Sequence, residues 1–119
     1  MSYDISFRAK VEGVDEYIEV GDYLMNITWN VRDIITKSTG LAWKNEENNG
    51  LVKDVIPNIR KGLRELEDHG EKYLQYESPN GWGTVEGTKR FFRNILESWD
   101  DCCCWHDAEL TDVLTFWIT

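Results

Sequence analysis

The strongest chemical signal in this sequence is a run of cysteines close to a histidine. All three cysteines and one of the two histidines lie within Asp101-Cys102-Cys103-Cys104-Trp105-His106-Asp107. Cysteine thiolates and neutral imidazole are the preferred ligands of tetrahedral zinc. The sequence therefore predicts a structural zinc site whose ligands come from Cys102, Cys103, Cys104 and His106. The two-residue gap usual between paired zinc ligands is absent from this run.

The backbone conformation decides which of these side chains meet. In an extended segment, Cys102, Cys104 and His106 point to one side, because side chains alternate along a strand. In a helix, Cys102 and His106 share a face, since residues four apart are neighbours there. Both geometries bring at least one thiolate toward His106. Three neighbouring ligands leave the fourth position of a tetrahedral site open, and the candidates for it are His69, an acid such as Asp100, or a water molecule.

Two other interpretations use the same residues. Reduced cysteines are also common as small buried hydrophobic residues, and His106 would then only cap the end of a helix. An enzyme could use Cys104 as a nucleophile with His106 as its base, but the neighbouring aspartates Asp100, Asp101 and Asp107 disfavour the thiolate. The chain has no glycine-rich phosphate loop, nucleophile elbow or metalloprotease helix motif. We therefore expect a protein that is not an enzyme, with no catalytic residues and no organic cofactor.

The sequence predicts a strand at each end of the chain, with the elements that would position these residues between them. Tyr3, Ile5, Phe7 and Ala9 alternate with polar residues, the period of a half-buried strand. Turn residues then lead to a second strand at 17–20, which predicts a hairpin. The chain also ends in β-forming residues, so the last part of 110–119 is predicted to be a strand. The two terminal strands are expected to pair in one sheet.

Two amphipathic helices are predicted between these strands. Apolar residues at helical spacing indicate one helix over 51–68, which Pro57 either begins or kinks. A second helix is expected from Thr84, a good N-cap, to about Trp99. Residues 23–31 are predicted to be a strand running into a short helix, and residues 38–50 a loop. The result is a single α+β domain over residues 1–119, in which a small mixed or antiparallel sheet packs in two layers with two main helices.

Charge limits the classes of partner. The chain has 119 residues and a formal net charge of −9, from 22 acidic against 13 basic residues. Nucleic acids are bound mainly through Lys and Arg, so we expect no direct nucleic-acid binding and instead a basic protein partner. The alternative is that acidity only maintains solubility. Without a basic leader or about 20 consecutive apolar residues, the protein is expected to be soluble and cytoplasmic, with no membrane partner.

Six residues in turn-rich or acidic segments are the predicted partner contacts. A tryptophan in a loop either contacts a partner or packs back on the core, and acids suit a basic partner. The partner-binding candidates are Trp43, Trp82, Asp15, Glu16, Glu46 and Glu47. Trp99 and Trp117 lie on strongly patterned segments and are expected in the core.

Two short segments carry a resemblance. Ser2-Tyr3-Asp4-Ile5 and Asn26-Ile27-Thr28-Trp29-Asn30 resemble segments of small phage and mobile-element proteins of unknown function. The acidic, aromatic-rich composition is similar to that of the broad class of phage anti-defence proteins, of which the anti-CRISPR inhibitors are best known. That resemblance implies stoichiometric binding to a CRISPR effector nuclease in the host cytosol, which blocks nucleic-acid loading or activation. The alternatives are an accessory or scaffold protein with a structural metal site, and a Cys/His enzyme.

Overall fold

A computed structural model describes most of the chain. It covers residues 2–10, 13, 15–19, 25–41, 43, 47–79, 81–103 and 114–118. The strands are β1 (Ser2–Lys10), β2 (Tyr17–Glu19), β3 (Met25–Thr28), β4 (Glu47–Leu51) and β5 (Leu114–Ile118). The helices are α1 (Arg32–Thr39), α2 (Val52–His69) and α3 (Val85–Cys103), with short 3₁₀ segments η1 (Trp29–Val31) and η2 (Gly70–Tyr76).

All strand pairs of the five-stranded sheet are antiparallel, and β1 is its central strand. One edge of β1 pairs with β5, and the other pairs with β3 near its start and β2 near its end. Strand β4 adds to the far edge of β5. The predicted hairpin and the predicted pairing of the terminal strands are therefore confirmed, as is the α+β class.

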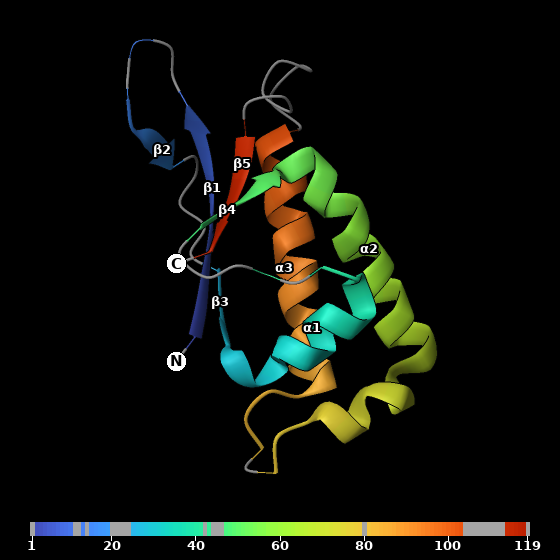
Figure 1. The fold of residues 1–119 in the computed structure, drawn as a ribbon. Helices are drawn as coiled ribbons and strands as arrows, with labels where there is room; N and C mark the ends of the chain where they lie inside the picture. The colour runs from blue at the N-terminus through green and yellow to red at the C-terminus, as the bar shows by residue number, and fades with distance from the viewer. Residues whose placement is uncertain are drawn as a thin grey trace.

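The helices cover one face of this sheet and produce the two predicted layers (Figure 1). Alternation along β1 directs Tyr3, Ile5, Phe7 and Ala9 into the core, where each is at most 8% exposed. Strand β5 adds Phe116 and Ile118. The apolar faces of α2 and α3 close the core with Val52, Val55, Ile56, Ile59, Leu66, Val85, Phe91, Phe92 and Ile95.

The two long helices have the predicted positions, and the short α1 packs with them. Pro57 lies inside α2 instead of at its start, so one hydrogen bond of that helix is missing. Close packing is possible because Gly62 of α2 is buried and has no side chain. A Cβ atom there would lie 2.6 Å from Thr39 of α1 and 3.2 Å from Phe92 of α3. Gly62 thus sets how closely the three helices approach.

The predicted loop over 38–50 is wrong at both ends, whereas Gly40, Leu41 and Trp43 lie outside helices and strands as predicted. Ser38 and Thr39 belong to α1 and are buried, and the Thr39 hydroxyl donates to the Ile35 carbonyl at 2.6 Å. Residues 47–51 form β4, although Asn and Gly are poor strand formers. Pairing with β5 stabilises this strand despite its low β propensity. Tertiary contacts override the turn-rich composition at both ends of this segment.

None of the helices in the described part of the chain is long and apolar enough to cross a bilayer.

Candidate functional site

The cysteine cluster begins at the C-terminal end of α3. Cys102 and Cys103 are the last two residues of this helix, so this part of the cluster is helical. Cys104 and His106 lie outside the described residues. Among the residues that the structure describes, no three His, Cys, Asp or Glu side chains gather as a metal site. The zinc site therefore stays a prediction, since two of its four neighbouring candidate ligands, Cys104 and His106, lie outside the described residues.

His69 is placed far from these cysteines. Helices α2 and α3 run antiparallel, and His69 ends α2 where α3 begins (Figure 1). An ion pair joins Arg93 of α3 to Glu67 of α2 at 3.3 Å. From Arg93 to Cys102 the helix rises roughly 13 Å, in the direction away from His69. The structure therefore does not bring His69 to Cys102 or Cys103 as a further ligand.

Trp43 is a core residue, which corrects its assignment as a partner contact. It is 8% exposed and lies among aromatic rings, with centroid distances of 5.7 Å to Tyr3, 5.9 Å to Phe91 and 5.5 Å to Phe116. These rings come from β1, α3 and β5, which no local pattern around Trp43 reveals. Because its ring fills the space between sheet and helices, Trp43 is not accessible to a partner.

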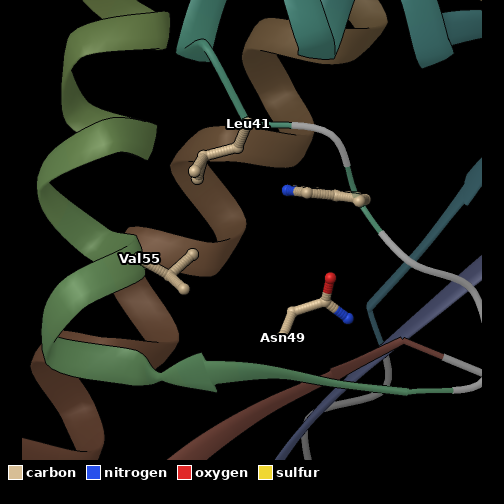
Figure 2. Close-up of a pocket in the computed structure, with 4 residues that line it drawn as sticks. Leu41, Asn49 and Val55 are labelled. Carbon is tan, nitrogen blue, oxygen red and sulfur yellow. The ribbon is translucent and has the colours of Figure 1, made fainter.

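A small cavity of about 40 Å³ lies beside Trp43. Figure 2 shows Leu41, Val55 of α2 and Asn49 of β4 around it, and Trp43 completes the lining. The indole Nε1 of Trp43 is buried and has no hydrogen-bond acceptor among the described atoms. Leaving such a donor unpaired costs roughly 1–3 kcal/mol. Packing of the ring must offset this cost.

Trp82 lies on a turn whose backbone is held by several contacts. It is 66% exposed, more than any other large hydrophobic residue in the described part of the chain. The Gly81 amide donates to the Ser78 carbonyl at 3.1 Å. Gly83 has a φ of +85° and lies so close to η1 that a Cβ atom there would be 2.7 Å from the Asn30 Cβ. Trp82 is therefore accessible, and its role as a partner contact stays a prediction.

The start of α3 anchors the other end of this turn. The Thr84 hydroxyl accepts from the Gly87 amide at 2.9 Å, so the predicted N-cap is confirmed. A Glu77 carboxylate oxygen accepts from the Val85 amide, also at 2.9 Å. Two first-turn amides of α3 are satisfied by side chains, and the turn enters the helix at a fixed angle.

The predicted acidic contacts do not form one surface with Trp82. Asp15 and Glu16 are exposed between β1 and β2, at the opposite end of the molecule from the turn between η2 and α3 (Figure 1). Glu47 begins the edge strand β4, and Glu46 lies outside the described residues. Since the longest dimension is 48 Å, the hairpin and Trp82 mark two separate ends.

Two basic residues on α3 are paired with acids. Lys89 contacts Glu86 at 2.7 Å, and Arg93 contacts Glu67 at 3.3 Å. The hydrogen bond from Lys89 lowers the pKa of Glu86 below its usual value. These pairs are surface contacts that neutralise local charge.

An open groove between α1, α2 and η2 was not found from the sequence. It has a volume of about 430 Å³ and is lined by Lys37, Glu65, Lys72, Tyr73, Gln75 and Tyr76. The Tyr73 hydroxyl donates to a Glu65 carboxylate oxygen at 3.1 Å. Burial is the main cause that raises the pKa of Tyr73 above its usual value, and this hydrogen bond raises it further. Three separate elements supply the lining, so no spacing in the sequence indicates the groove.

The outer face of the sheet carries polar residues around Trp117. This tryptophan is only half-buried, which corrects its expected place in the core. Neighbouring Phe116 and Ile118 point inward, so Trp117 points outward. Its indole Nε1 donates to the Thr115 hydroxyl at 2.8 Å, and the Arg8 guanidinium lies 4.8 Å from its ring centroid. Cation–π contact and hydrogen bonding hold the ring against the sheet.

No family model, curated protein or solved structure matches this chain.

Proposed function

We propose that this protein acts by stoichiometric binding to a basic, nucleic-acid-handling protein, and that the partner is a CRISPR effector nuclease, which it inhibits. The observation that carries the proposal is Trp82, 66% exposed on a turn braced at both ends. Tryptophan is enriched among the residues that dominate binding energy. A turn whose backbone is already held in place loses little conformational freedom on association.

Charge supports this class of partner. The net charge of −9 favours encounter with a positively charged surface. RNA-guided effectors hold their heteroduplex in a positively charged channel, so an acidic protein suits that surface. Binding there would block nucleic-acid loading or a conformational step needed for activation.

One interface is expected to use one end of the molecule. A typical interface buries roughly 800 Å² on each partner, which is too little to include both ends of a chain 48 Å long. We assign the direct contact to Trp82. The acids Asp15 and Glu16 then act only through the long-range field, which changes association rates more than dissociation rates.

The test measures target cleavage by purified effectors from the main CRISPR types, each loaded with its guide RNA, with and without this protein. We expect inhibition of at least one effector at equimolar protein. Trp82→Ala should weaken its binding roughly 30-fold, since an interface hot spot contributes about 2 kcal/mol. The matched control is the double variant Asp15→Asn with Glu16→Gln, which should weaken binding only a few-fold, mainly through a slower, salt-dependent association.

Three results would count against the proposal in different ways. Full cleavage activity of every effector at saturating protein would reject CRISPR inhibition. Binding without inhibition would favour the accessory or scaffold function. Inhibition that Trp82→Ala leaves intact would reject the turn as the contact.

A further inference from the structure

The groove between α1, α2 and η2 has the size of a ligand site. Its volume of about 430 Å³ falls within the roughly 300–1,000 Å³ typical of small-molecule pockets. Lys37 comes from α1, Glu65 from α2, and the remaining lining residues from η2. Because all of these elements pack on the core, the groove is a formed feature of the fold.

The charged groups of the groove are unevenly paired. Glu65 accepts the hydrogen bond from Tyr73, so this carboxylate already has a partner. Lys37 and Lys72 are exposed, and neither forms an ion pair with a carboxylate of the described ranges. In contrast, Lys89 and Arg93 on α3 both have acidic partners. A protein rich in acids thus presents two lysines without carboxylate partners to the same groove, which favours an anionic ligand.

The groove also has an aromatic wall. The rings of Tyr73 and Tyr76 are 6.3 Å apart at an interplanar angle of 48°. Tyr73 is 7% exposed and held by Glu65, whereas Tyr76 is half-buried and borders the open volume. Aromatic faces of this kind bind flat rings by stacking. The site therefore offers two cationic donors beside a surface for a planar, apolar group.

We propose that this groove binds a phosphate monoester carried on a flat aromatic body, which is the chemistry of a nucleoside monophosphate. The ammonium groups of Lys37 and Lys72 contact the phosphate, and their flexible stems allow both to reach it. The base stacks on Tyr76. This site is separate from the Trp82 turn and does not depend on the proposed inhibition.

The experiment titrates the protein with adenosine 5′-monophosphate. Calorimetry and NMR chemical-shift changes measure the binding. Adenosine and inorganic phosphate are titrated in parallel to separate the two halves of the ligand. We expect saturable binding of the monophosphate, with each half at least 10-fold weaker. The double variant Lys37→Gln with Lys72→Gln should lose at least 10-fold in affinity, and Tyr76→Leu should bind the monophosphate no better than inorganic phosphate.

Matched controls separate the groove from general charge. The double variant Lys61→Gln with Arg90→Gln removes two exposed cations outside the groove and should bind with unchanged affinity. Trp82→Ala should also bind normally, so this test stands whether or not the proposed inhibition holds. Absence of saturable binding at millimolar monophosphate would overturn the proposal. So would equal losses in the two charge variants, because the lysines would then act only through net charge.

Discussion

Trp43 and Trp82 both lie in segments rich in turn residues, yet the fold uses them in opposite ways. Trp43 is 8% exposed and Trp82 is 66% exposed. Turn chemistry shows only that a segment leaves regular structure, and it does not determine which way a ring points. Trp43 turns inward because aromatic residues of β1, α3 and β5 receive it. Trp82 precedes Gly83, which lies close against Asn30 of η1, and its ring is exposed.

The energetics of the two rings differ accordingly. Truncation of a buried tryptophan typically costs about 3–5 kcal/mol, which exceeds the roughly 1–3 kcal/mol lost by leaving the Trp43 Nε1 unpaired. Core packing therefore outweighs the missing hydrogen bond. Trp82 is 66% exposed, so burial of its ring contributes less to stability than burial of the Trp43 ring.

The sharpest test of this comparison is alanine substitution at each tryptophan. We expect Trp43→Ala to lower the free energy of unfolding by about 3–5 kcal/mol, since it removes ring contacts with three elements and leaves a cavity. Trp82→Ala should change it by less than about 0.5 kcal/mol. Urea denaturation followed by circular dichroism measures both. Similar losses in the two variants would mean that Trp82 is also a structural residue.

A second test concerns the support of the exposed turn. Gly83→Ala adds a Cβ that meets the Asn30 Cβ at 2.7 Å and the Asn30 backbone carbon at 2.9 Å, at a φ of +85°. We expect a loss of about 2–4 kcal/mol in unfolding free energy, from backbone strain and overpacking together. The matched control is Gly81→Ala. Gly81 has a φ of +78°, and no atom lies within 4 Å of where its Cβ would be. Only the backbone strain of about 1–2 kcal/mol therefore applies. Equal effects would show that η1 moves away freely and does not hold the turn.

Periodic features of the fold were predictable from the sequence, and features that depend on distant contacts were not. Alternation in β1 and helical spacing in α2 each identify a buried face, because those periods follow from local geometry. The Thr84 cap was also predictable, since it satisfies the amide of Gly87, only three residues away. In β5, the expected burial of Trp117 was wrong because alternation places it opposite Phe116. The groove required the packing of α1, α2 and η2, which no local pattern encodes.

The smallest expected effect comes from the cap that ends the exposed turn. Thr84→Ala removes the acceptor of the Gly87 amide and should lower the free energy of unfolding by about 1 kcal/mol. Glu77 still accepts from the Val85 amide, so α3 keeps one of its two caps and should not unravel. Thr84→Ser keeps the hydroxyl and should lie within a few tenths of a kcal/mol of the original protein. If alanine and serine behaved alike in denaturation, the hydroxyl would not stabilise the junction. The turn that carries Trp82 would then be held by the Glu77 cap, the hydrogen bond from Gly81 to Ser78 and the contact of Gly83 with η1.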